Sequence, residues 1–169
     1  MPMIETERLV LRQYGPEDIP GILALAEDPV VSKFIGNLPD CEEAAWARLL
    51  RCVGHWSLFG CGTLAVIDKT SGNLLGEVGA AYFRRGVDPM LDTVPEGSWL
   101  FFSEYAGSGF AFEAMSGLLG WIKRSTSHDR VACLIEPVNG PSLKLANRLG
   151  FRPVKDISYR DRPFILLAT

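Results

Sequence analysis

Two glycines one residue apart, Gly107 and Gly109, lie between an apolar strand pattern and an amphipathic helix pattern. We predict the strand over residues 98–102 and the helix over residues 110–124, where apolar side chains recur at helical spacing. Glycine allows backbone N–H groups to gather around an anion, and a helix N-terminus adds partial positive charge there. The segment therefore fits a phosphate-binding turn. It fits equally well an ordinary connection that uses glycine only to turn tightly.

The composition is that of an ordinary globular protein. The 169 residues suffice for one domain with a substantial core, and 47% of them are hydrophobic. The net charge is −3 and basic residues occur at most in pairs such as Arg84-Arg85, which argues against nucleic-acid binding. No apolar stretch reaches the length of a membrane span, and the N-terminus lacks the apolar run of a signal peptide. We therefore expect a cytoplasmic protein with no membrane partner.

The sulfur and imidazole groups are too scattered to suggest a metal site. The four cysteines are Cys41, Cys52, Cys61 and Cys133, and no two of them form a C-x-x-C pair. This pattern favours reduced, largely buried thiols over a disulfide framework. The sequence has only two histidines, far apart, so we expect no zinc site and no other metal.

The predicted elements follow the order β-αα-βββ-α-β-α-ββ. Strands are predicted over residues 8–13, 63–68, 74–83, 98–102, 131–135, 151–159 and 163–168. Helices are predicted over residues 16–28, from residue 40 onward, over 110–124 and over 141–148. The sequence shows no internal repeat and no linker. We therefore expect a single mixed α/β domain over residues 1–169.

Two of the helices carry clear side-chain patterns. Asp40 is predicted to cap the second helix, because Glu43 three residues later completes a capping-box pattern. The inward face of this helix is predicted to hold Trp46, Leu49, Leu50 and Val53. The inward face of the helix after the glycines is predicted to hold Ala111, Ala114, Met115, Leu118 and Ile122.

A second motif follows the glycines by about 30 residues. Residues 139–151 read NGPSLKLANRLGF, residues 104–114 read EYAGSGFAFEA, and residues 6–12 read TERLVLR. In this order the three motifs resemble those of the GCN5-related N-acetyltransferase (GNAT) family, and in particular the branch that includes the ribosomal-protein N-terminal acetyltransferases. The resemblance covers nearly the whole chain.

The resemblance implies a GNAT-like fold, with a mostly antiparallel sheet of about seven strands flanked by about four helices and splayed where acetyl-CoA binds. It implies that the pantetheine of acetyl-CoA pairs with the strand edge at Phe101, Phe102 and Ser103. It implies that the pyrophosphate binds the N–H groups of Gly107, Ser108, Gly109, Phe110, Ala111 and Phe112. On the other side of the CoA it implies contacts from Asn139 and Ser142.

Three positions depart from the pattern of the family. Members often have Arg, Gln or Trp at the position of Ala106 and Lys or Arg at that of Ser108, so here the backbone and the helix dipole would hold the pyrophosphate. Many members have a Tyr at the position of Ala146, usually assigned to protonate the CoA thiolate. A thiol with a pKa of about 8.5 tolerates weak or water-mediated protonation, so this loss is less damaging than the loss of a base.

Acetyl transfer to an amine requires a base and a donor for the tetrahedral oxyanion, for which a strand N–H near Phe101 or Phe102 is a candidate. Glu96 is the first candidate for the base, because it opens the strand before the glycines and matches the acid of the E-x-G-Y stretch of the family. Glu77 is a close rival, since a glutamate within an apolar strand is unusual, and Glu136 is third. The alternatives are an exposed strand-end carboxylate for Glu96 and a solvated strand face for Glu77.

Most of the other polar and aromatic candidates have both a functional and a structural interpretation. Ser142 either hydrogen-bonds the thiolate or the pantetheine, or bonds a backbone N–H in the first turn of its helix. His55 is a pocket wall, a base or, as the favoured interpretation, a structural histidine. Cys133 is interpreted as a core residue, because direct attack needs no covalent enzyme intermediate. Trp99 and Tyr82 line the acceptor site or pack in the core.

The resemblance implies an enzyme that moves an acetyl group from acetyl-CoA to a primary amine by direct attack, as a monomer or homodimer. The acceptor, a protein N-terminus or a small amine, is not identified by the sequence. The alternative is a non-catalytic acyl-CoA-binding module with the same fold. A dinucleotide-binding dehydrogenase is disfavoured because Phe112 stands where the third glycine is required. A nucleoside triphosphatase is disfavoured because no G-K-[ST] follows.

Overall fold

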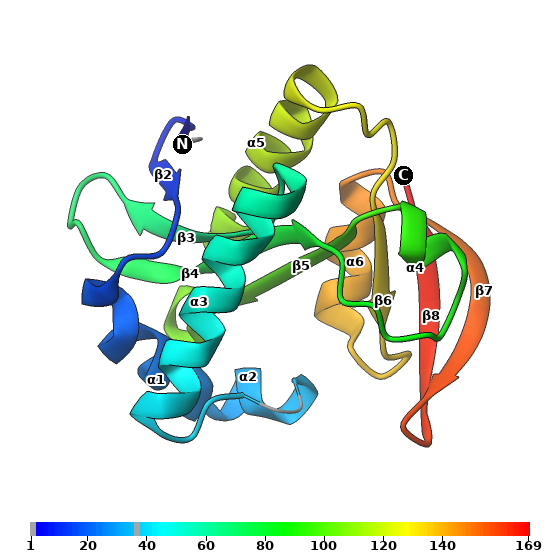
Figure 1. The fold of residues 1–169 in the computed structure, drawn as a ribbon, viewed down its shortest axis with the longest axis horizontal. Coiled ribbons are helices and arrows are strands. Elements are labelled where there is room, and N and C mark those ends of the chain that lie inside the picture. The colour runs from blue at the N-terminus through cyan, green and yellow to red at the C-terminus, as the bar shows by residue number, and fades with distance from the viewer. Residues whose placement is uncertain (1–2, 36–37) are drawn as a thin grey trace.

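The computed structural model describes residues 3–35 and 38–169. Within them the strands form one eight-stranded sheet, in the order β1-β2-β3-β4-β5-β6-β8-β7 (Figure 1). The strands are β1 (Ile4–Glu5), β2 (Leu9–Arg12), β3 (Thr63–Asp68), β4 (Leu74–Ala81), β5 (Glu96–Phe101), β6 (Ala132–Ile135), β7 (Arg152–Tyr159) and β8 (Arg162–Ala168). In this sheet β5 and β6 are parallel and the other neighbours are antiparallel. The expected mostly antiparallel sheet is confirmed, and β1, too short to show an alternating pattern, adds an eighth strand.

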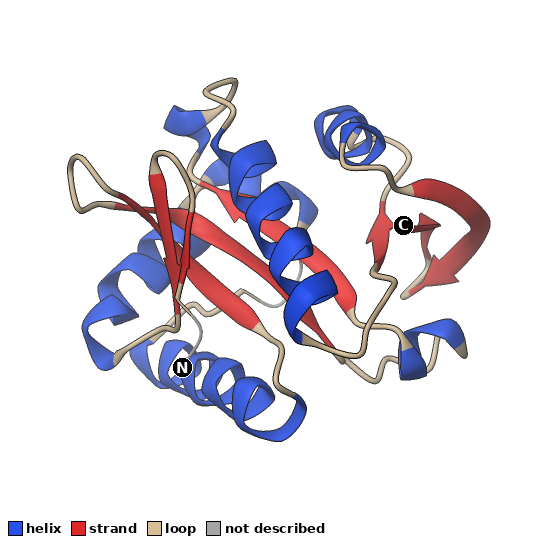
Figure 2. Cartoon of the chain, turned by 90° about the horizontal axis from the view of Figure 1, so that it is seen from above, coloured by secondary structure: helices blue, strands red, loops and turns tan. Residues whose placement is uncertain are grey.

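Helices cover both faces of the sheet (Figure 2). They are α1 (Ile19–Glu27), α2 (Pro29–Phe34), α3 (Glu42–Phe59), α4 (Met90–Thr93), α5 (Phe110–Ser125) and α6 (Gly140–Arg148). α5 packs its predicted side chains on one face, where Ala114, Met115, Leu118 and Ile122 are buried and Ala111 is half-buried. α1 and α3 pack on the other face, around Ala65 of β3. Among the described residues no helix combines the length and the apolar character that a membrane span requires.

The predicted start of the second helix is wrong, and its predicted inward face is correct for only two of four residues. The N-cap of α3 is Cys41 in place of Asp40, and no side chain of the described residues caps the helix. The buried side chains of α3 are Ala45, Leu49, Cys52 and Trp56. Trp46 and Leu50, predicted to point inward, are 45% and 53% exposed. Leu49 is buried as predicted and Val53 packs against the same core, so the two exposed residues are the ones that the apolar pattern placed wrongly.

The first predicted helix consists of more than one segment. A 3-10 turn at Pro16–Asp18 precedes α1, which ends at Glu27 as expected, and α2 follows at once. Asp28 caps α2, because its Oδ1 accepts the N–H groups of Val30 at 2.9 Å and Val31 at 3.2 Å. Pro29 stands at the first position of α2, where a missing N–H costs nothing. Asp28 is thus both the C-cap of α1 and the N-cap of α2.

β5 and β6 diverge after a single point of pairing. Glu96 pairs with Ala132, whose N–H donates to the carbonyl of Pro95 at 3.0 Å. β5 then continues to pair with β4 as far as Phe101, while β6 continues to pair with β8 as far as Ile135. The sheet thus divides into two halves, seen side by side in Figure 2. The predicted splay between these strands is present.

Gly76 allows β4 to approach β5 closely where β5 ends. Gly76 pairs with Phe101, and a Cβ at Gly76 would lie 2.1 Å from the carbonyl oxygen of Leu100 and 2.7 Å from the Cα of Phe101. These are backbone atoms, which cannot rotate away as the end of a side chain can. The end of β5 is therefore held tightly against β4.

Gly76→Ala is expected to lower the free energy of unfolding by roughly 1–3 kcal/mol, because the methyl group forces the two strands apart. The matched control is Gly54→Ala in α3, where a Cβ meets nothing within 4 Å. That variant is expected to keep or raise the stability, by up to about 1 kcal/mol, because alanine favours helix. Urea unfolding followed by circular dichroism measures both. Equal stabilities of the two variants would contradict the close approach.

Candidate active site

The glycine turn connects the end of β5 to α5. Gly107 and Gly109 adopt φ angles of 79° and 80°, a conformation that costs glycine little and strains other residues. Gly109 is the N-cap of α5, and no side chain of the described residues caps this helix. A Cβ placed on Gly107 would meet no atom within 4 Å. The first N–H groups of α5 are thus left without a side-chain acceptor beside an uncrowded turn.

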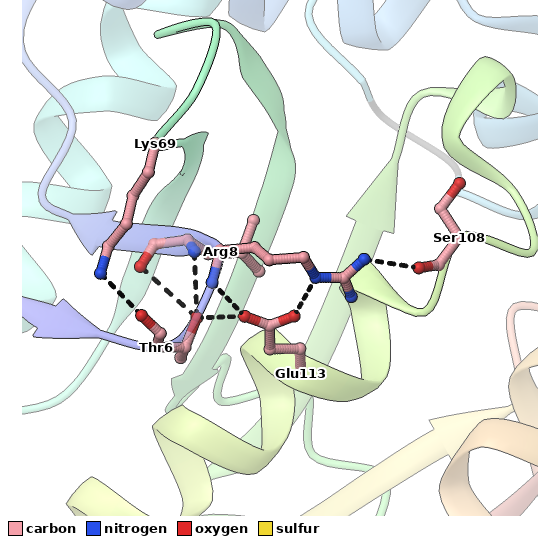
Figure 3. A network of polar contacts seen from close by, with 6 residues as sticks. Thr6, Arg8, Lys69, Ser108 and Glu113 are labelled. Carbon is pink, nitrogen blue, oxygen red and sulfur yellow. Dashed lines mark hydrogen bonds and ion pairs between the residues drawn. The ribbon is translucent and has the colours of Figure 1, made fainter.

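Arg8, from the segment before β2, contacts this turn (Figure 3). Its Nη1 donates to the carbonyl of Ser108 at 3.1 Å, and its guanidinium carbon lies 4.3 Å from the centre of the Phe110 ring. Its Nε donates to Oε2 of Glu113 on α5 at 2.6 Å. Oε1 of Glu113 accepts the N–H of Arg8 at 2.8 Å and the hydroxyl of Thr6 at 2.6 Å. The chain start is therefore bonded to the beginning of α5.

The edge of β5 that faces β6 carries free peptide groups near its end. The N–H of Phe102 donates to the carbonyl of Leu75 at 3.1 Å, so by the alternation of a strand the peptide groups of Trp99 and Phe101 point toward β6. The N–H of Ser103 donates to Oδ2 of Asp28 at 2.8 Å. Of the three residues predicted to pair with pantetheine, Phe101 turns its peptide groups to the divergence. The N–H groups of Phe102 and Ser103 are bonded within the protein.

α6 borders the divergence from the other half of the sheet. Asn139 caps this helix, because its Oδ1 accepts the N–H of Ser142 at 3.2 Å. The indole Nε1–H of Trp99 on β5 donates to Oγ of Ser142 at 3.2 Å, so one side chain reaches across the divergence. The Ser142 hydroxyl keeps its own hydrogen for another acceptor. Ala146 is fully buried, and its position serves packing.

Glu96 lies where β5 and β6 meet and is 6% exposed. Burial raises the pKa of its carboxyl group to about 7, although Arg85 nearby lowers it. Nη2 of Arg85, in the loop between β4 and α4, lies 3.1 Å from Oε1 of Glu96. The alternative of an exposed strand-end carboxylate is therefore ruled out. A buried carboxyl group that titrates near neutral pH is suited to accept and release a proton.

Glu77 is also buried, but both of its carboxylate oxygens have partners. The hydroxyl of Tyr14 donates to Oε2 at 2.8 Å, and Arg48 of α3 forms an ion pair with Oε1. Burial and the Glu77 carboxylate raise the pKa of Tyr14 well above its usual value, so Tyr14 remains a neutral donor. The strand register places Glu77 and Glu96 on the same face, roughly 13 Å apart along the strands. The two carboxylates therefore do not form a pair.

The other candidates have mainly structural contacts. Glu136, after β6, is buried and forms an ion pair with Arg162 at 2.5 Å. The ring nitrogens of His55 lie 3.1 Å from the carbonyl of Arg51 and 3.0 Å from that of Tyr82, which links α3 to the end of β4.

Two further candidates also have structural surroundings: Cys133 is buried, and Tyr82 packs among other aromatic rings. Cys133 is buried, and burial, together with the nearby Glu96, raises the pKa of its thiol well above the usual value. The Tyr82 ring packs against Phe59 and His128, at centroid distances of 5.2 and 5.9 Å.

Sequence reasoning missed the basic partners of the glutamates and the role of Arg8. Arg48 and Glu77 are 29 residues apart, and Arg8 and Ser108 are 100 residues apart, so no local pattern connects them. The only signal available was general: a buried carboxylate needs a cationic partner, without indication of which one.

Comparison with known proteins identifies related sequences over most of the chain. Residues 8–152 match the family described as the acetyltransferase (GNAT) domain. An uncharacterized N-acetyltransferase, p20, of Bacillus licheniformis is 28% identical over 155 residues, which cover 90% of this chain and 83% of that protein.

Solved structures agree over the full length of the chain. A GNAT-family acetyltransferase from Bordetella pertussis superposes with a TM-score of 0.89 and 35% identity, covering 99% of each chain. A ribosomal L7/L12 α-N-protein acetyltransferase in complex with coenzyme A superposes with a TM-score of 0.83 at 12% identity, covering 99% of this chain and 97% of that one. The family match, the fold and the diverging strands lead to the same conclusion. The chain belongs to the GNAT acetyltransferase family.

Proposed function

We propose that this acetyltransferase moves the acetyl group of acetyl-CoA directly to a primary amine, either a protein N-terminus or a small-molecule amine. The observation that carries the proposal is the single-point pairing of β5 with β6. Beyond Glu96 and Ala132 the strands separate, and the free edge of β5 leads to a glycine turn and an uncapped helix N-terminus. An extended chain that ends in a phosphate group fits that sequence of features.

The donor site is formed by the two sides of the divergence. Peptide groups of Phe101 on the β5 edge would pair with the pantetheine. The N–H groups of Phe102 and Ser103 are bonded to Leu75 and Asp28 and would not. The N–H groups of Gly107, Gly109, Phe110, Ala111 and Phe112 would bind the pyrophosphate, and that of Ser108 would do so on leaving the Tyr105 carbonyl, to which it donates at 3.3 Å. Asn139, the N-cap of α6, and Ser142 would contact the opposite side. The open space in front of Gly107 fits the close approach of a phosphate group. Acetyl-CoA supplies an activated thioester.

Glu96 is the group best placed to take the proton from the amine. It lies at the point where the strands meet, and its pKa of about 7 lets it act as a base at neutral pH. Glu77 lacks a free oxygen, because Tyr14 and Arg48 engage both. We therefore assign the base to Glu96 and a structural role to Glu77.

Ser142 is the candidate donor to the leaving thiolate. The hydrogen bond that its oxygen accepts from Trp99 orients the hydroxyl and leaves the hydroxyl hydrogen available. A charge-assisted hydrogen bond to sulfur suffices here, because a thiolate is a good leaving group.

Glu96→Gln is expected to lower kcat by roughly 10²–10⁴-fold, the usual contribution of a general base. The base acts as carboxylate, so activity of the unaltered enzyme should be full above about pH 8 and fall as the pH drops through about 7. The variant should lack that fall. Steady-state rates with acetyl-CoA and a panel of amines, measured from pH 5.5 to 9, test this. The titration of the amine is common to both proteins, so the difference reports Glu96.

Glu136→Gln is the control for that experiment, and loss of the pH-dependent fall in this variant would transfer the assignment of the base to Glu136.

Titration of the protein with CoA separates binding from turnover. Binding without turnover of any amine would favour the non-catalytic acyl-CoA-binding module over an enzyme.

Arg48→Met is expected to lower the free energy of unfolding by about 3–5 kcal/mol at pH 7.5, because it leaves the buried Glu77 carboxylate without its cation. Adding Glu77→Gln should restore most of the loss. Urea unfolding measures the stability of both variants. Glu77→Gln alone should retain turnover and its pH dependence. A stable but inactive Glu77→Gln enzyme would refute the structural assignment.

A further inference from the structure

The glycine turn has no charged side chain of its own, yet a cation lies on it. Ala106 and Ser108 are uncharged, whereas Arg8 reaches the turn from 100 residues earlier in the sequence. Figure 3 shows the Arg8 side chain extending from the chain start along the beginning of α5 to Ser108. Its side chain is 43% exposed, and that of Glu113 is 17% exposed. The contact is specific, because separate nitrogens of one guanidinium bond Glu113 and the Ser108 carbonyl.

The bond from Arg8 fixes the carbonyl of Ser108, whose N–H already donates to the carbonyl of Tyr105 at 3.3 Å. Gly107 and Gly109 flank Ser108, and glycine loses more conformational freedom on ordering than any other residue. In a trans peptide the carbonyl and the following N–H point in opposite directions. Holding the Ser108 carbonyl on Arg8 therefore directs the N–H of Gly109 away from the guanidinium, where an anion can receive it.

The ion pair with Glu113 has a second effect on the turn. Glu113 lies in the first turn of α5, where its negative charge would oppose an anion at the helix N-terminus. Its two oxygens accept from Nε of Arg8, from the backbone N–H of Arg8 and from the hydroxyl of Thr6. Arg8 thus cancels the unfavourable charge while it fixes the peptide.

We propose that Arg8 is a positioning residue for the pyrophosphate of the acyl donor, acting through Ser108 and Glu113. This inference rests on the proposed function, because it takes acetyl-CoA as the donor. The acyl donor without its pyrophosphate, S-acetylpantetheine, gains nothing from an ordered turn. The effect of Arg8 must therefore depend on which of the two donors is used.

Arg8→Gln is expected to raise the KM for acetyl-CoA roughly ten-fold or more, the size of a lost hydrogen bond to a charged group, and to leave kcat nearly unchanged. Pyrophosphate binding is equal in the ground and transition states, which places the loss in KM. With S-acetylpantetheine, kcat/KM is expected to change little. Steady-state kinetics with both donors and one amine measure the difference. An equal loss with both donors, or an unchanged KM for acetyl-CoA, would overturn the inference.

A double variant and a control separate positioning from folding. Arg8→Gln with Glu113→Gln removes the unbalanced charge as well, and should bind CoA more tightly than Arg8→Gln alone. A double variant that binds no better would contradict the charge argument.

Lys69→Ala is the control, because Lys69 bonds the Thr6 carbonyl at 2.7 Å and Glu5 at 3.1 Å without contacting the turn. It should show no dependence on the donor. Thermal unfolding of each variant identifies a general loss of fold.

Calorimetric titration with CoA distinguishes failure of the proposed acetyl-CoA donor from failure of the proposed role of Arg8. Absence of CoA binding by the unaltered protein overturns both, whereas tight and equal binding by the unaltered protein and Arg8→Gln overturns only the role of Arg8.

Discussion

The rest of the site depends on the pairing of β5 and β6 at a single register position. Because Glu96 and Ala132 are the only paired positions of these two strands within the described residues, each strand afterwards follows its other neighbour. The free peptide groups near Phe101 and the contact of Trp99 with Ser142 lie at this divergence, and Glu96 is buried at the paired position itself. A sheet that paired fully would satisfy its own hydrogen bonds and leave no edge for a ligand.

Buried glutamates in this fold are matched with arginines from other elements. Glu77 has Arg48 of α3, and Glu96 has Arg85 of the loop before α4. The outcomes differ, because Glu77 also receives the hydroxyl of Tyr14, whereas Glu96 keeps a raised pKa. One carboxylate therefore has a donor on each oxygen, and the other is able to change its charge near neutral pH. The number of donors around each group decides which role it can take.

Most of the fold could be predicted from the sequence, since its elements carry strong local patterns. The inward face of α5 was correct because its large apolar residues lie on one stripe. The inward face of α3 was only partly correct. Leu49 is buried as predicted, but Trp46 and Leu50 are exposed, while Ala45 and Cys52 approach the sheet. At the site, sequence motifs indicated the glycine turn and Glu96. They did not indicate the arginines that contact the turn and the buried glutamates, which are Arg8, Arg48 and Arg85. Ion pairs between distant segments depend on the tertiary arrangement, which no local period encodes.

The contact between Arg8 and Ser108 also bears on how this part of the protein can be inherited or transplanted. The two glycines, α5 and the motif at residues 139–151 form a continuous stretch of sequence that could be transferred to another protein as one piece. Yet Arg8 lies between β1 and β2, so an excised segment would contain the turn without its contact to this guanidinium. The contact spans 100 residues, so its formation requires closing a loop of that length. The turn would therefore acquire its final shape only once Arg8 and Ser108 have come together.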